Sequence, residues 1–176
     1  PAYHYTHEDR LPLAVANKIL GGGMSSRLFI NIRERQGLCY YIRSAFDPYT
    51  DAGGWYVRAG LDKNRIDEAI TRILEEFKKL KDKGVTSEEL QEAKDGVRGS
   101  MIVQLEDSLA VADFYGKRKL LTGEIISPEE ALAKIDAVTH KDIERVVTDL
   151  LVPEKLNLAV VGSFDDKERF KKLLTF

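Results

Sequence analysis

Three consecutive glycines at positions 21–23 interrupt a helical pattern early in the chain and constrain how the chain can fold. Before them, apolar residues recur at helical spacing over positions 11–20, and a glycine directly after such a pattern usually ends the helix. After them, Ser25 or Ser26 can cap a second helix, which Gly37 would end. The glycines are therefore expected to form a corner between two helices.

Strand and helix signals follow in a definite order. Aromatic and β-branched residues predict strands at 40–46 and 55–61, joined by a seven-residue turn over positions 47–53. The remaining predictions are a helix over 62–83, a long helical stretch from the Thr86 capping box to Leu121 with a break near Asp107, helices starting at Ser127 and Thr139, a short strand over 156–161 and a last helix over 165–174. This order predicts an α+β fold, with helices packed on a mostly antiparallel sheet.

Composition limits the function classes. The chain has 176 residues, of which 43% are hydrophobic and 32% charged, as in a single globular domain of ordinary size. A net charge of −2 provides no basic field, so we expect neither nucleic acid nor a membrane as a partner. Cys39 is the only cysteine, which rules out an intrachain disulfide and a thiolate zinc cluster. It favours the cytoplasm over the periplasm, although an exported protein without disulfides is equally compatible.

Several apparent functional clusters have simpler explanations. The glycine run precedes a helix, as in phosphate-binding loops, but it has no preceding strand and no following lysine. His4 and His7, with the acidic residues 8–9, do not have the spacing of a zinc motif, and acidic residues before a helix are explained by the helix dipole. We therefore predict no metal site on this chain.

Arg33 and Tyr40 are the candidate site residues. The chain reverses at Gly37, so Tyr40 can return beside the helical turn that carries Arg33. A guanidinium and a phenol can both donate hydrogen bonds to a carbonyl oxygen. From residue types alone, helix-end electrostatics and packing are the more ordinary explanations of the two side chains.

The segment Leu20-Gly-Gly-Gly-Met-Ser-Ser-Arg-Leu-Phe29 and the following Arg33-Glu-Arg-Gln-Gly-Leu-Cys-Tyr40 resemble the insulinase and pitrilysin type of zinc peptidases. The resemblance covers most of the chain and extends to the closing Leu156-Asn-Leu-Ala-Val-Val-Gly162 segment. The family's inverted zinc motif, His-x-x-Glu-His, is absent. The chain therefore resembles the C-terminal, inactive half-domain of such enzymes, with a fold like that of mitochondrial processing peptidase.

This resemblance implies a function that the residues alone do not. A homologous half, on the same polypeptide or in a separate subunit, would carry the zinc, and Arg33 and Tyr40 would contact the carbonyl of a peptide substrate across a closed chamber. This half would then be inactive alone, within a parent zinc metalloendopeptidase. The alternative is a non-catalytic assembly subunit, like the respiratory-complex core or processing-complex proteins that resemble these peptidases.

The resemblance also bears on domain organisation. We expect residues 1–176 to form one domain and a fragment of a longer peptidase chain, since no initiator methionine is present. A family strand just before Pro1 would then be lacking, and a sheet edge would be left unpaired.

Overall fold

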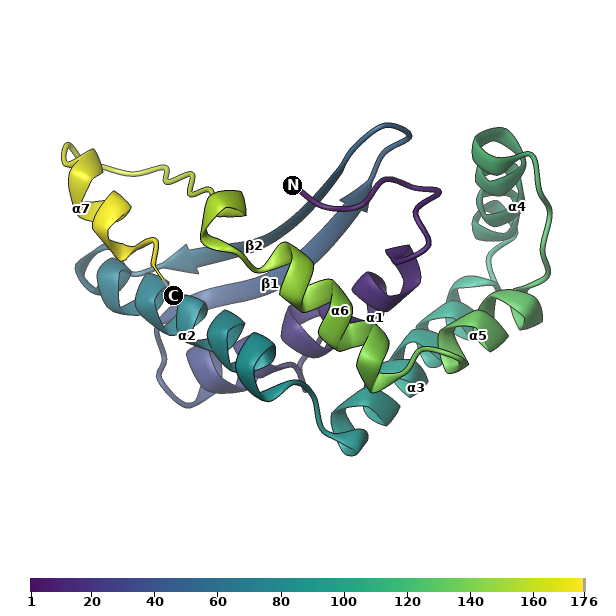
Figure 1. Ribbon diagram of the computed structural model, residues 1–176, viewed down its shortest axis with the longest axis horizontal. Helices are drawn as coiled ribbons and strands as arrows, with labels where there is room; N and C mark the ends of the chain where they lie inside the picture. The colour runs from purple at the N-terminus through teal and green to yellow at the C-terminus, as the bar shows by residue number, and fades with distance from the viewer. Residues whose placement is uncertain (176) are drawn as a thin grey trace.

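In the computed structural model, which describes residues 1–175, helices dominate and a single hairpin provides the strands. The elements are α1 (Arg10–Gly21), the π-helix η1 (Phe29–Glu34), β1 (Cys39–Pro48), β2 (Gly53–Leu61), the 3₁₀ turn η2 (Lys63–Arg65), α2 (Ile66–Lys83), α3 (Ser87–Gln104), α4 (Ser108–Thr122), α5 (Pro128–Asp136), α6 (His140–Leu150), the 3₁₀ turn η3 (Pro153–Lys155) and α7 (Lys167–Leu173). The α+β class is confirmed, with an antiparallel sheet and helices packed on it (Figure 1).

The two strands pair in antiparallel register along their whole length, with Ser44 opposite Val57. Side chains alternate between the two faces of a strand, so Ile42 and Ser44 are buried while Tyr41 and Arg43 are exposed. The helix α1 packs against the buried face of β1. The sheet thus has one face covered by helices and one face open to solvent.

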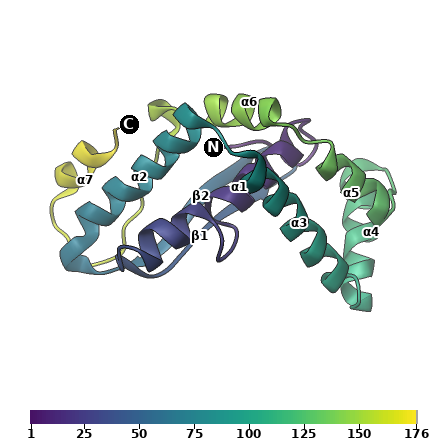
Figure 2. The same ribbon diagram turned by 90° about the horizontal axis from the view of Figure 1, so that it is seen from below.

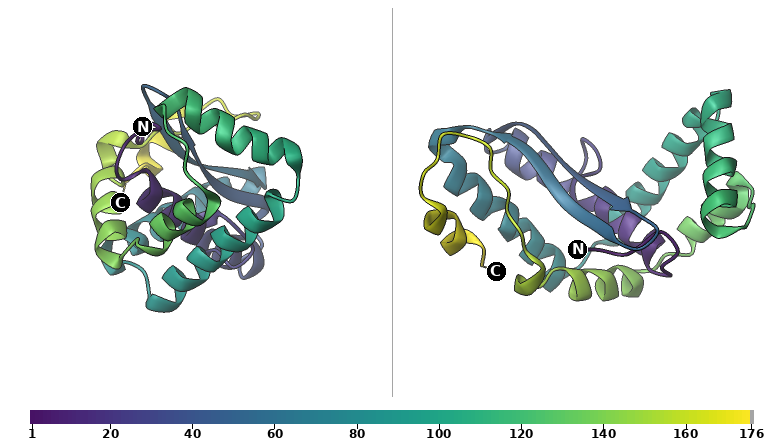
Figure 3. Two further views of the ribbon diagram at one scale, coloured as in Figure 1. Left: turned by 90° about the vertical axis from the view of Figure 1, so that its right-hand side faces the viewer. Right: turned by 90° about the horizontal axis from the view of Figure 1, so that it is seen from above.

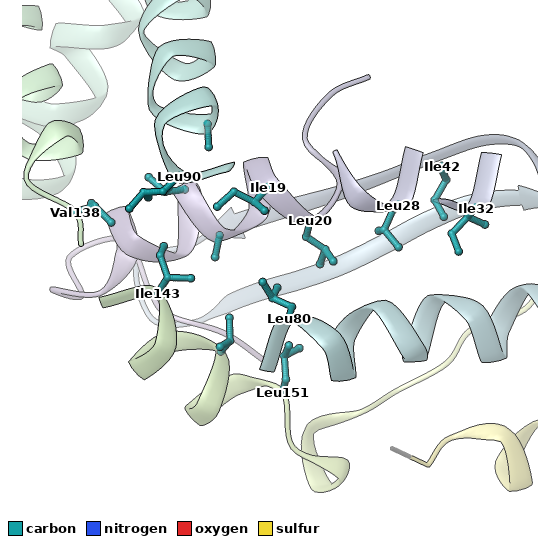
Figure 4. Close-up of a cluster of buried hydrophobic side chains, with 14 of the residues drawn as sticks. Ile19, Leu20, Leu28, Ile32, Ile42, Leu80, Leu90, Val138, Ile143 and Leu151 are labelled. Carbon is teal, nitrogen blue, oxygen red and sulfur yellow. The ribbon is translucent and has the colours of Figure 1, made fainter. Parts of the chain in front are cut away.

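The main core surrounds α1 and is completed by η1, β1, α2, α3, α5 and α6. Figure 4 shows Leu20, Leu28, Ile32 and Leu80 pointing into the space between these elements. All four are at most 1% exposed, and each such side chain contributes about 1.5–3 kcal/mol by leaving water. This core joins the first two helical segments to the hairpin and to α2.

The end of α1 approaches the backbone of β1 very closely. A Cβ atom on Gly21 would lie 2.6 Å from the Ser44 backbone nitrogen, so only glycine fits there. The Ser44 hydroxyl donates a hydrogen bond of 3.0 Å to the carbonyl oxygen of Asn17, and the Trp55 indole N–H donates one of 3.0 Å to Asn17 Oδ1. These contacts fix how the helix lies on the strands.

The predicted helix starts are confirmed. Thr86, Ser127 and Thr139 each accept a hydrogen bond from the third residue of the following helix, and the acidic side chain at that position bonds back. The break after α3 is confirmed as well, because the Asp107 carboxylate accepts a hydrogen bond of 2.8 Å from the backbone N–H of Leu109. Local capping chemistry alone therefore sets these boundaries.

Helices α3, α4 and α5 form an arm that extends from one end of the molecule (Figures 2 and 3). Along α4 no residue is buried, and Leu109 and Leu120 are 75% and 84% exposed. Within residues 1–175, no helix is both long and apolar enough to cross a membrane.

Three predicted boundaries are wrong. The second helical segment begins directly after Ser26, as predicted, but it ends at Glu34 and not at Gln36, and residues 29–34 form a π-helix. The hairpin connection is four residues long and not seven, because both strands continue into the turn, where the Tyr49 N–H donates to the carbonyl oxygen of Ala52.

The third error is the strand over 156–161, which forms no strand in the described structure. A groove of about 680 Å³ separates this segment from β2, so its backbone has no strand to pair with. The groove is lined on its other side by α2 and includes Pro1. At the same edge of β2, the N-terminal residues form only one bridge, Ala2 with Gly53.

The close approach of α1 to β1 gives a first prediction. Gly21→Ala should lower the free energy of unfolding by about 1–3 kcal/mol, because the added methyl group meets rigid backbone. Gly99→Ala is the matched control, since nothing lies within 4 Å of its Cβ position in α3, and it should stabilise the protein by up to about 1 kcal/mol. Chemical denaturation of both variants measures the difference. Equal stability of the two variants would contradict the close approach.

Candidate functional site

Arg33 projects from an irregular helical turn. The Arg35 N–H donates to the carbonyl oxygen of Ile30 at 3.0 Å, five residues back, which widens the helix at this point. Ile32 faces the core, and its neighbour Arg33 is exposed. The guanidinium carbon of Arg33 lies 4.7 Å from the centre of the Phe29 ring. Within residues 1–175 it has no carboxylate partner, so its N–H donors are available.

Tyr40 lies at a β-bulge. Cys39 is opposite Leu61 and Tyr41 is opposite Gly60, so two steps along β1 match one step along β2 and Tyr40 is the extra residue. A bulge redirects side chains from the regular alternation and is frequent beside active sites. Tyr40 is 86% exposed, and its hydroxyl makes no hydrogen bond within the part of the chain that the structure describes.

The turn between Arg33 and Tyr40 brings both residues to one end of the hairpin. Gly37 adopts a φ of 58°, and Leu38 donates its N–H to the carbonyl oxygen of Ile32 at 3.1 Å while its side chain is buried. Burial raises the pKa of the Cys39 thiol, and the positive charge of Arg33 opposes that rise. The guanidinium therefore lies near Cys39, the residue that precedes Tyr40.

Both candidate residues are thus exposed. Their backbone settings, a π-helix and a β-bulge, were not predicted, because neither irregularity has a composition signal in one sequence. Within residues 1–175, neither a hydrogen bond nor a cation–π contact joins Arg33 to Tyr40. The two side chains are available to a third group.

An ion pair that sequence reasoning missed holds η1 in place. Arg27, just before η1, donates to both carboxylate oxygens of Glu89 at 2.6 and 2.8 Å and to the carbonyl oxygen of Gly84 at 2.7 Å. Glu89 is also the capping-box residue that accepts from the Thr86 N–H. These hydrogen bonds lower the pKa of Glu89, with the Arg27 contact as the largest cause. The start of η1 is therefore fixed to the start of α3.

The residues near the N-terminus are used for packing and ion pairing. The His7 ring stacks on Tyr3 at 4.0 Å, and the Tyr3 hydroxyl donates to Asp149 at 2.8 Å. Asp9 makes no side-chain cap; instead it accepts hydrogen bonds from Arg145 of α6. A long-range ion pair, which sequence reasoning missed, thus engages the carboxylate of Asp9 directly before α1.

No group of three or more His, Cys, Asp or Glu residues within positions 1–175 is placed to hold a metal ion. Cys39 is a free, half-buried thiol.

The chain is similar in sequence to a known protein family and to curated proteins. The family described as peptidase M16 inactive domain matches residues 1–97. A protein named as an uncharacterized zinc protease from Streptomyces coelicolor is 34% identical over 168 residues, which are 96% of this chain and 36% of that protein. The chain thus spans little more than a third of the length of this relative.

Solved structures show the same fold. A conserved protein from Enterococcus faecalis superposes with a TM-score of 0.75 at 27% identity, over 83% of this chain and 34% of the other. A chain of complex III2 from Candida albicans superposes with a TM-score of 0.72 at 23% identity, over 84% of this chain and 37% of the other. The second likeness shows the fold alone.

The Arg27–Glu89 pair gives a prediction about pH. The pKa of Glu89 is lowered in the folded state, so the pair stabilises the fold above about pH 4.5 and this contribution is lost as the pH falls through the lowered pKa. Glu89→Gln should lower the free energy of unfolding by about 1–3 kcal/mol at pH 7, and the difference from wild type should shrink towards pH 3.

Glu92→Gln is the control, because Glu92 lies exposed on the same helix without a partner in the described structure. Denaturation curves from pH 3 to 7 compare the three proteins. A difference between wild type and Glu89→Gln that is constant over this range would contradict the ion pair.

Proposed function

Because the chain belongs to the peptidase M16 inactive-domain family, we propose that it forms the non-zinc half of a zinc metalloendopeptidase. In this proposal Arg33 and Tyr40 donate hydrogen bonds to the substrate, and the domain forms one wall of a closed peptide chamber. The partner is a homologous half, which carries the zinc, and the substrate is a peptide.

One observation carries the proposed role of the pair. Arg33 and Tyr40 are exposed, have hydrogen-bond donors without acceptors in the described structure, and stand on two backbone irregularities that adjoin one tight turn. Both π-helical segments and β-bulges are frequent at functional sites. A side chain that only packs would bury its ring or pair its charge, and neither occurs here.

The chemistry of the pair suits a peptide carbonyl. When a nucleophile attacks the carbonyl carbon, negative charge develops on its oxygen, and donors already in position stabilise that charge. The guanidinium of Arg33 stays charged and offers several N–H donors, whereas Tyr40 offers one O–H. The same donors can hold the neighbouring substrate backbone in an extended conformation.

The described residues of this chain do not fit a zinc ion, because they include no cluster of suitable ligands. Zinc would supply a Lewis acid from the homologous half. The residues of this chain would bind and orient the substrate from the opposite side.

The proposal predicts the effect of removing either donor. In the assembled protein, Arg33→Ala or Tyr40→Phe should lower kcat by about 10²–10³, because each removes a donor used in the transition state. Folding and assembly should be unchanged, since both side chains are exposed.

Arg35→Ala and Tyr49→Phe are the matched controls. Arg35 lies two residues beyond Arg33 and bonds Asn31, and Tyr49 is 61% exposed at the tip of the hairpin. Both should retain nearly full activity in a peptide-cleavage assay. Full activity of the Arg33 and Tyr40 variants would remove the catalytic role and favour the alternative, a non-catalytic assembly subunit.

A metal analysis tests whether the zinc is held by the homologous half and not by this chain. The isolated chain should retain no stoichiometric zinc after dialysis and should cleave no peptide, whereas the assembly with the homologous half should hold zinc. Elemental analysis that finds about one tightly bound zinc per isolated chain, at the affinity usual for structural sites, would refute this assignment.

A further inference from the structure

The open face of the hairpin carries an unusual arrangement of charge. Tyr41 and Arg43 on β1 and Arg58 on β2 are all exposed, on the face opposite to the one that α1 covers. The helices gather on one side of the strands, as views from below and above show (Figures 2 and 3). This face, defined by Tyr41, Arg43 and Arg58, is called the arginine face below.

Arg43 and Arg58 are direct cross-strand partners. Side chains in such a pair have Cβ atoms about 4.5–5.5 Å apart, and like charges in this position destabilise a sheet. The fold does not neutralise them. Arg58 stacks on the Tyr56 ring at 4.7 Å, and Arg43 has no partner within residues 1–175.

The acidic side chain on this face is already engaged. Asp47 lies four residues beyond Arg43 on β1 and therefore on the same face. It accepts a hydrogen bond of 2.5 Å from the Tyr56 hydroxyl, and this bond raises the pKa of Tyr56. The sheet thus holds two uncompensated guanidinium groups side by side, in an arrangement that an anion from outside would stabilise.

The arginine face begins beside Tyr40. Tyr40 and Arg43 are three residues apart on one strand, which corresponds to about 10 Å at the usual rise of about 3.3 Å per residue. An extended peptide has nearly the same rise. An extended peptide that runs along β1 from Tyr40 would place a side chain about three residues from the held carbonyl level with Arg43 and its cross-strand partner Arg58.

We propose that the arginine face is a specificity subsite for an acidic side chain of the peptide substrate, about three residues from the carbonyl that Arg33 and Tyr40 contact. This inference rests on the proposed function. A glutamate or aspartate carboxylate would bind between the two guanidinium groups, with the Tyr41 ring beside it. A lysine or arginine at the same position would be repelled.

The test uses the assembled protein and a series of peptides that differ only at the third residue on either side of the scissile bond, where Glu, Gln or Lys is placed. Of the two Glu peptides, one on each side of the scissile bond, the wild-type protein should prefer one. Its kcat/KM should be about tenfold above that of the Lys peptide with the substitution at the same position, because charges interact with this strength near a protein surface. The ratio should fall as salt is raised, because exposed charges are screened.

The double variant Arg43→Glu/Arg58→Glu should reverse the order of the Glu and Lys peptides. Lys141→Glu/Lys172→Glu is the control with the same change of net charge, on exposed residues of α6 and α7, and should keep the wild-type order. Fluorescence anisotropy with the same labelled peptides measures binding independently of cleavage.

The outcomes separate the two proposals. If Tyr40→Phe lowers kcat on every peptide while the ratio of Glu to Lys stays at its wild-type value, both proposals are supported. If wild type cleaves the Glu and Lys peptides equally well, the subsite is refuted and the proposed function stands. If no peptide is cleaved, the proposed function fails, and equal binding of the Glu and Lys peptides then refutes the subsite as well.

Discussion

The approach of Gly21 to the backbone of Ser44 is the contact on which the rest of the structure depends. It lets the end of α1 touch β1 without an intervening side chain, so that Leu20 and Leu28 on either side of the corner enter one core. The chain then turns back at once into η1. A side chain at position 21 would push the corner away from the strand, and Arg33 on η1 would then shift relative to Tyr40 on β1.

The segment from η1 to the start of β1 combines a buried, well-packed layer with two exposed side chains. Leu28, Ile32 and Leu38 are buried, and the Arg27–Glu89 pair fixes the first turn of η1 to α3. On this layer the π-helix and the β-bulge turn Arg33 and Tyr40 to solvent. A site that stabilises developing charge needs such order, because donors that must first be oriented lose much of their advantage.

Local chemistry made most of the fold predictable. The capping boxes at Thr86, Ser127 and Thr139 act within four residues, and they give the helix starts correctly. The strand predicted over 156–161 was wrong because a strand depends on a partner, and apolar composition does not reveal whether one is present. The Arg27–Glu89 and Asp9–Arg145 pairs join residues far apart in sequence, which no local pattern indicates. The choice of Arg33 and Tyr40 came from family resemblance; the structure adds their exposure and backbone setting.

The central claim is that Arg33 and Tyr40 donate hydrogen bonds to the scissile carbonyl oxygen of the substrate or to the backbone beside it. It is tested most directly by a crystal structure of the assembled protein with a peptide analogue that carries a tetrahedral phosphinate at the scissile position. The account predicts an Arg33 nitrogen and the Tyr40 hydroxyl within about 2.7–3.1 Å of a phosphinate oxygen or of the adjacent peptide backbone. A bound phosphinate with both side chains turned away and beyond hydrogen-bond distance would contradict it.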